Sequence, residues 1–153
     1  MDVQLLEQNL IKNPKNVSMK ITVETLVNAS IEKVWSCWTE PAHITQWNAA
    51  SDDWHTPHAE NDLRTGGTFS SRMEAKDGSF GFDFGGTYDE VIPQERIAYT
   101  MSDGRKVEIT FTQQGEAVKI VETFDAEQEN SPEIQKSGWQ AIMNSFKTYT
   151  EKS

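Results

Sequence analysis

The strongest constraint on the fold is a series of short segments in which apolar residues occupy every second position. Such alternation is typical of strands with one buried face. It occurs in residues 20–28, 69–74, 79–91, 97–101, 107–111 and 117–124. Turn signals such as Asp77-Gly78 and Ser102-Asp103-Gly104 separate the later segments and favour hairpins. The pattern therefore predicts an antiparallel meander. Within the segment 79–91, we interpret Gly85-Gly86 as a bulge that curves the strand.

Two helices are predicted by capping signals followed by apolar stripes. Ser30 can cap a helix that carries Val34, Trp35 and Trp38 on one face, and Pro41 ends it. Ser131-Pro132-Glu133 is a typical helix start, and a long helix should run from there to about Thr150. Its apolar stripe consists of Trp139, Ile142, Met143, Phe146 and Tyr149.

The segment from Pro41 to Arg64 is irregular. We expect a short helix around 42–47 and then a long connection, of the kind that often carries function. Counting six strands from about residue 57 onward, the expected order is one strand, two helices, six strands and one helix.

Length and composition favour one globular domain. The chain has 153 residues, and we divide it into an extension, 1–18, and a domain, 19–153. The extension is either a packed N-terminal arm or the product of an alternative translation start. The formal charge of -10 argues against nucleic acid as a partner, since such binding depends on clustered Lys and Arg. No apolar run is long enough to span a membrane, and the lone Cys37 cannot form an intramolecular disulfide. We therefore expect a cytoplasmic location.

A long helix lying across a curved sheet leaves a space that a ligand can occupy. A helix of eighteen residues is about 27 Å long, enough to cross the concave side. The predicted class is α+β, a helix-grip with an internal cavity. The candidate ligand-binding residues are Trp47, Trp54, His58, Phe69, Met73, Phe82, Phe84, Tyr99, Phe111, Trp139 and Met143. The alternative is that the apolar members of this set only fill the core.

Four short motifs follow one another along the chain. They are Ser30-Ile31-Glu32-Lys33-Val34-Trp35 with Trp38, Pro41 and Trp47; Asp62-Leu63-Arg64-Thr65-Gly66-Gly67-Thr68-Phe69; Gly86-Thr87-Tyr88-Asp89-Glu90-Val91-Ile92-Pro93; and Arg96-Ile97-Ala98-Tyr99. In this order they resemble the activator of heat-shock protein 90 ATPase homologue family, over residues 19–151. The resemblance implies a START-like, Bet v 1-like helix-grip of the order β-α-α-β6-α. It is greatest to the single-domain prokaryotic type, because a separate chaperone-binding domain is not part of the sequence.

His55 and His58, beside Asp52, Asp53 and Glu60, have a spacing that would permit a metal site, but that spacing is a weak signal. We favour a solvated acidic loop in which His58 at most lines the cavity mouth. Cys37 is interpreted as a small buried hydrophobe rather than a nucleophile. General acid or base work would need Glu122 or His58 in the cavity, and the strand parity around Glu122 is ambiguous. We assign no catalytic residue, no metal and no cofactor.

The favoured function is non-enzymatic binding of a lipophilic small molecule or lipid, with a link to stress or chaperones left open. Two alternatives remain. One is a cyclase or hydratase acting on an apolar substrate, and the other is a co-chaperone-like interaction domain with a chaperone as its partner.

Overall fold

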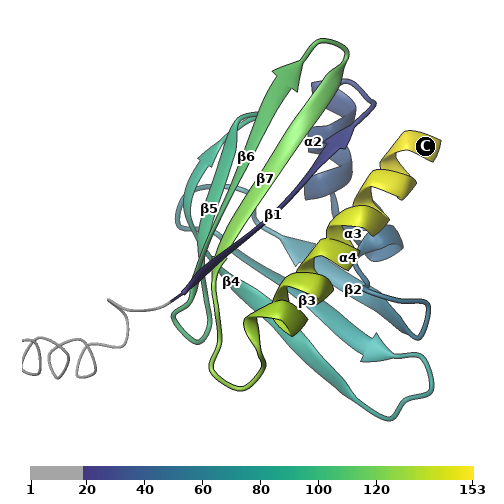
Figure 1. Ribbon diagram of the computed structural model, residues 1–153, viewed down its shortest axis with the longest axis vertical. Helices are drawn as coiled ribbons and strands as arrows, with labels where there is room; N and C mark the ends of the chain where they lie inside the picture. The colour runs from purple at the N-terminus through teal and green to yellow at the C-terminus, as the bar shows by residue number, and fades with distance from the viewer. Residues whose placement is uncertain (1–18) are drawn as a thin grey trace, which may run out of the picture.

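The structure is a computed structural model that describes residues 19–153. Seven strands form one curled antiparallel sheet, and α4 lies across its open side (Figure 1). The elements are β1 Lys20–Val27, α2 Ile31–Thr39, α3 Pro41–Trp47, β2 Trp54–Asn61, β3 Thr68–Ala75, β4 Gly81–Ile92, β5 Arg96–Met101, β6 Lys106–Gln114, β7 Ala117–Asp125 and α4 Pro132–Lys152. The predicted order β-α-α-β6-α is confirmed. The extension 1–18 lies outside the described residues.

The sheet has the strand order β1-β7-β6-β5-β4-β3-β2. From β2 to β7, each strand pairs with the next strand in the chain, as in a meander. β1 pairs with β7. In that pair Lys20 lies opposite Asp125 and Val27 lies opposite Val118. The two edges of the sheet are therefore β1 and β2, which come from the beginning of the described chain.

The long connection expected after the short helix contains a strand, β2. It pairs with β3, from Trp54 opposite Ala75 to Asn61 opposite Phe69. The register shifts between His55 and His58, in the stretch that contains Pro57. Proline cannot donate to a strand ladder, so an edge strand with an irregularity is a position that tolerates it. Apolar and polar residues do not alternate regularly in this segment, because β2 is an irregular edge strand.

The glycines of β4 have a different role from the predicted bulge. The register shift between β4 and β5 lies between Tyr88 and Glu90, beyond both glycines. At Gly85, a Cβ would lie 2.5 Å from the carbonyl oxygen of Phe69, and at Gly86 it would lie 2.4 Å from that of Thr100. The two glycines therefore permit close approach of β3 and β5 on either side of β4.

A Gly86→Ala substitution should lower the free energy of unfolding by about 2–3 kcal/mol, because its methyl group would overlap backbone that cannot move independently. Gly138 in α4 is the matched control, since a Cβ there meets no atom within 4 Å. Gly138→Ala should raise stability by about 0.5–1 kcal/mol through better helix propensity. Urea denaturation followed by circular dichroism measures both, and equal effects of the two substitutions would contradict this account.

Both predicted helix starts are confirmed. The side chain of Ser30 accepts a hydrogen bond from the backbone N–H of Lys33 at 3.2 Å. Ser131 accepts one from Ile134, also at 3.2 Å, and Pro132 is the first residue of α4. No helix within residues 19–153 combines the length and the apolar character needed to cross a membrane.

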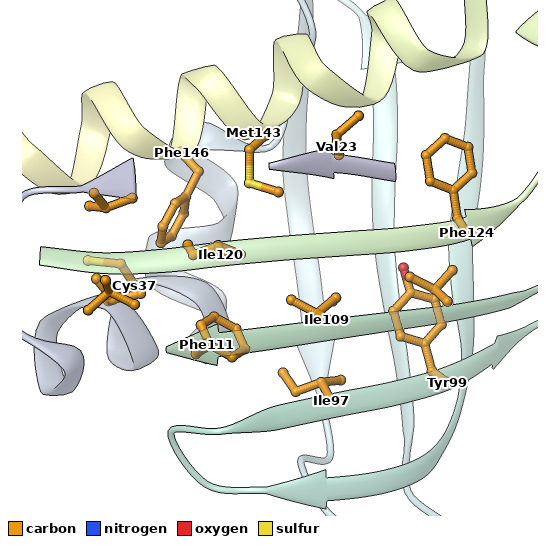
Figure 2. Close-up of a cluster of buried hydrophobic side chains, with 14 of the residues drawn as sticks. Val23, Cys37, Ile97, Tyr99, Ile109, Phe111, Ile120, Phe124, Met143 and Phe146 are labelled. Carbon is orange, nitrogen blue, oxygen red and sulfur yellow. The ribbon is translucent and has the colours of Figure 1, made fainter. Parts of the chain in front are cut away.

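The hydrophobic core lies between the concave face of the sheet and the helices. Figure 2 shows Met143 and Phe146 pointing from α4 toward the strands, where they face Ile120 and Ile109. Phe146 is fully buried and its ring contacts Trp38 and Trp47 edge-on, with centroids 4.8 and 4.9 Å away. The stripe predicted for the long helix is thus the face that packs on the sheet.

Polar contacts join α4 to the β1 edge of the sheet. Gln140 Nε2 donates to the carbonyl oxygen of Glu24 at 3.1 Å, and Lys147 Nζ donates to that of Leu26 at 2.6 Å. Just beyond β1, the backbone N–H of Asn28 donates to the Glu151 carboxylate at 2.7 Å. The helix thereby provides partners for backbone groups of this edge that β7 leaves free.

Candidate functional site

A cavity of about 220 Å³ lies between the concave face of the sheet, α3 and α4. Most of its lining is apolar or aromatic. It is formed by Trp38, Thr39, Ile44, Trp47, Asn48, Glu60, Asn61, Phe69, Ser71, Met73, Phe82, Phe84, Tyr88, Ile97, Tyr99, Ile109, Glu122, Trp139, Ile142 and Met143. Glu60 and Phe82 are exposed to solvent, which places them at the mouth.

Aromatic side chains from different elements build one wall of this cavity. Phe69 from β3 contacts Tyr99 from β5, with ring centroids 4.7 Å apart. Phe84 from β4 contacts Trp139 from α4 at 6.2 Å, edge-on. Trp139 in turn stacks on Phe124 at 3.8 Å, with the planes inclined by only 10°. These contacts fix the rings on rigid strands and one helix, so the wall is preformed.

Glu122 is the carboxyl-bearing residue in the interior of the cavity. It lies on β7 opposite Val23 of β1 and Ile109 of β6, so its cross-strand neighbours are both apolar. Its exposed fraction is 7%, and its carboxyl group makes no hydrogen bond to any other residue of 19–153. Burial raises the pKa of this carboxyl to about 8. Glu122 is therefore mostly protonated at neutral pH.

The tyrosines of the cavity differ in how their hydroxyl groups are used. The Tyr88 hydroxyl donates to Asn61 Oδ1 at 2.6 Å, and Asn61 Nδ2 donates to the carbonyl oxygen of Thr39 at 2.7 Å. The Tyr99 hydroxyl has no such partner among the described residues. Burial, and secondarily the nearby Glu122, raises the pKa of Tyr99 well above its usual value. Tyr99 thus remains a neutral O–H donor throughout the physiological range.

No Lys, Arg or His belongs to the described lining of the cavity. Its ionisable side chains, apart from the two tyrosines, are Glu122 inside and Glu60 at the mouth. An anionic group entering the cavity would find no cation to pair with, and burying an unpaired charge is costly. The electrostatics therefore favour an uncharged or cationic guest over an anionic one.

The comparisons with known proteins give a family. The family model described as Activator of Hsp90 ATPase homolog 1-like protein matches residues 28–151. The chain belongs to this family. The comparison with curated proteins gives no match.

Two solved bacterial structures are similar to this Activator of Hsp90 ATPase homolog 1-like chain in both sequence and fold. The AHSA1-like protein from Aeromonas hydrophila is 46% identical with a TM-score of 0.83, over 88% of this chain and 93% of that one. Chr148 from Cytophaga hutchinsonii is 60% identical with a TM-score of 0.76, over 87% and 92%. A third, NE0264 from Nitrosomonas europaea, shares the fold at 18% identity and a TM-score of 0.75, over 88% and 95%.

Eight of the eleven predicted ligand-binding residues line the cavity. They are Trp47, Phe69, Met73, Phe82, Phe84, Tyr99, Trp139 and Met143. Their common feature is a position on the inner side of a strand or helix.

The other three predicted residues lie outside the cavity. Phe111 is buried under α2, where its ring contacts Trp35 and Trp38 at 5.3 and 5.7 Å. The side chain of His58 is 67% exposed and its Nε2 lies 3.0 Å from a Glu60 carboxylate oxygen. Trp54 begins the edge strand β2, with its ring 6.0 Å from Phe80 and 6.1 Å from Phe82. These positions depend on how α2 and the edge strand β2 pack in the fold, and the spacing of residues in the sequence does not predict that packing.

Several lining residues were missed from the sequence. Ser71 shares the alternation of Phe69 and Met73, so the period of two would have found it. Asn61 gives no such signal, because its segment lacks the alternation of a strand. Glu122 was considered for acid or base work, and the register with Val23 now resolves the ambiguity in its strand parity.

The cavity lining includes neither the histidines considered for a metal site nor Cys37. Within residues 19–153, no cluster of three or more His, Cys, Asp and Glu side chains has an arrangement suited to a metal ion. His55 instead lies 3.7 Å from Glu74, across the β2–β3 pair. Cys37 is a buried free thiol in α2. The cavity is therefore mainly hydrophobic, and the buried carboxyl group of Glu122 is its most reactive side chain.

Proposed function

We propose that this protein binds a compact, lipophilic small molecule in the cavity between the sheet and α4, without transforming it. The observation that carries the proposal is the preformed aromatic cavity of about 220 Å³ with few polar groups. Small-molecule sites in proteins have this character: concave, mainly apolar, and with a small number of polar points that orient the guest. The modest volume favours a ligand of one or two rings over a long acyl chain.

An enzyme of the cyclase or hydratase type is the second candidate, and Glu122 is the observation that favours it. A carboxyl group whose pKa is raised to about 8 in an apolar cavity is suited to donate a proton near neutral pH. Conversion of a bound molecule, lost in Glu122→Gln while binding persists, would favour the enzyme. Recovery of the unchanged molecule favours a carrier or sensor.

A titration with the neutral fluorophore N-phenyl-1-naphthylamine tests the binding function. Trp38, Trp47 and Trp139 line the cavity, so energy transfer from tryptophan reports on a probe bound there. Phe82→Arg should weaken probe binding by about tenfold or more, because it places a charge at the mouth of an apolar site.

Phe80→Arg is the matched control. Phe80 is 62% exposed, lies close to Phe82 in sequence, and does not line the cavity. This control should leave probe affinity within twofold of the parent. Absence of saturable binding to the parent, or equal losses in the two variants, would contradict the proposal.

A further inference from the structure

The interior of the cavity holds two hydroxyl-bearing groups that the described chain leaves without hydrogen-bond partners. One is the carboxyl of Glu122, more than nine-tenths buried, and the other is the phenol of Tyr99, 6% exposed. Tyr88 and Asn61 differ, since they are bonded to one another. Both oxygens border open space in the cavity, since the fully enclosed side-chain atom without a partner within residues 19–153 is Thr150 Oγ1. A ligand that enters the cavity can therefore accept hydrogen bonds from both groups.

The two groups face the same space from different strands. Glu122 belongs to β7 and Tyr99 to β5, with β6 between them. Figure 2 shows the Tyr99 ring rising from β5 with its oxygen toward β7. Glu122 lies opposite Ile109, which lies opposite Ile97 of β5, and Tyr99 is two residues farther along that strand, so both side chains point to the same face of the sheet. Both side chains line the cavity, so one guest can reach both.

The chemistry of the pair distinguishes three classes of ligand. An anion has no cationic partner among the lining residues. A cation could pair with an ionised Glu122, but both charges would have to be desolvated, and such burial often costs more than the pairing returns. A neutral acceptor needs no charge in the cavity and satisfies existing O–H donors.

We infer that the ligand is a neutral, compact, apolar molecule with a carbonyl oxygen that accepts hydrogen bonds from Glu122 and Tyr99. This inference rests on the proposed binding function and adds the polar group of the ligand. The two donors orient the oxygen toward β7, while the aromatic wall contacts the apolar body.

Glu122 should control binding through its proton. The ligand accepts from the protonated carboxyl, so affinity is full below the pKa of about 8 and falls above it until the contribution of Glu122 is lost. The cross-strand neighbours of Glu122 are Val23 on β1 and Ile109 on β6, and α4 contributes Trp139, Ile142 and Met143 to the same cavity lining. The other titratable groups of the lining are Tyr99 on β5, Tyr88 on β4 and Glu60 at the mouth on β2. Burial raises the pKa of both tyrosines above its usual value, so neither ionises in this range.

Four naphthalene derivatives of similar shape test the inference by calorimetry or tryptophan fluorescence. They are 2-acetonaphthone, a neutral ketone; 2-ethylnaphthalene, without a polar group; 2-naphthylmethylammonium, a cation; and 2-naphthoate, an anion. The ketone should bind about tenfold more tightly than 2-ethylnaphthalene at pH 7, the factor expected of a buried hydrogen bond. This advantage should shrink between about pH 8 and pH 9.5 to the part that Tyr99 supplies.

Three variants assign the effect to the two side chains. Glu122→Leu should remove most of the ketone's advantage over 2-ethylnaphthalene, and continued saturable binding of 2-ethylnaphthalene to this variant shows that the cavity is intact. Glu122→Gln retains an N–H donor, so it should retain the preference without its pH dependence. Tyr99→Phe should reduce the preference severalfold at every pH.

The outcomes separate this inference from the proposed function. If none of the four compounds binds, the binding function fails. If 2-ethylnaphthalene binds as tightly as the ketone, only the present inference fails. Preferred binding of the ammonium compound that strengthens with rising pH would overturn it in favour of a cationic ligand.

Discussion

The stability of a Glu122→Gln variant relative to the parent should increase by up to roughly 5 kcal/mol as the pH rises from about 4 to about 9. The upper limit follows from the difference between the ordinary pKa of glutamate, 4.5, and the value of about 8 in the folded protein. Glu122 is the carboxyl group of residues 19–153 whose pKa is raised by burial, so its titration dominates this difference.

The sign of this effect follows from where the proton resides. Between pH 4.5 and about 8 the folded protein retains the Glu122 proton, whereas the unfolded chain releases it. Raising the pH therefore favours the unfolded chain of the parent, and the contribution of Glu122 is fully present only below pH 4.5. Glutamine does not titrate, so the variant lacks this loss.

Urea denaturation of both proteins at half-unit pH steps measures the effect. The difference between the two unfolding free energies is the useful quantity, because the remaining ionisable groups contribute equally to both. A difference that stays constant within about 0.5 kcal/mol across this range would show that Glu122 is solvated or paired in the folded protein.

A Phe146→Ala variant should lose about 3–5 kcal/mol of unfolding free energy. The side chain is fully buried, and its ring meets Trp38 of α2 and Trp47 of α3 at 4.8 and 4.9 Å. Its removal leaves a void at the point where three helices meet. Rigid indole rings on two sides restrict any collapse into that void, so the loss should lie well above that of a typical substitution.

Ile134→Ala provides the control on the same helix. Ile134 is 63% exposed near the start of α4, and its truncation should change stability by less than about 0.5 kcal/mol. Circular dichroism in urea compares both variants with the parent. A loss below about 1 kcal/mol for Phe146→Ala would mean that α4 does not pack on α2 and α3 through this ring.

Elements whose signals are local were predictable from the sequence. Ser30 and Ser131 mark their helix starts because a capping side chain bonds to backbone only three residues away. The alternating strands were found for a similar reason, since period two reports which face is buried without any knowledge of the partner strand.

The features that were missed depend on distant contacts. β2 is held by its pairing with β3, and Pro57 and His58 conceal the strand pattern locally. Gly85 and Gly86 look like bulge residues in isolation. Only the positions of the Phe69 and Thr100 carbonyl oxygens show that they allow close strand approach.

The cavity was predictable as a region but not in its details. Inward strand and helix positions identified most of the aromatic wall, because alternation specifies the inner face. Phe111 shares that face, yet the placement of α2 covers it with Trp35 and Trp38. The isolation of Glu122 could not be foreseen, since it requires knowing that Val23 and Ile109 flank it.

The contacts of α4 with the β1 edge have a consequence for synthesis on the ribosome. An uncovered strand edge can pair with another polypeptide, and its free carbonyl groups serve as the template. Gln140 and Lys147 occupy two such carbonyl groups on β1, but they follow all seven strands in the chain. A nascent chain therefore exposes a ready site for intermolecular pairing from the time β1 and β7 emerge until α4 docks, and this interval is when the protein is most prone to aggregate.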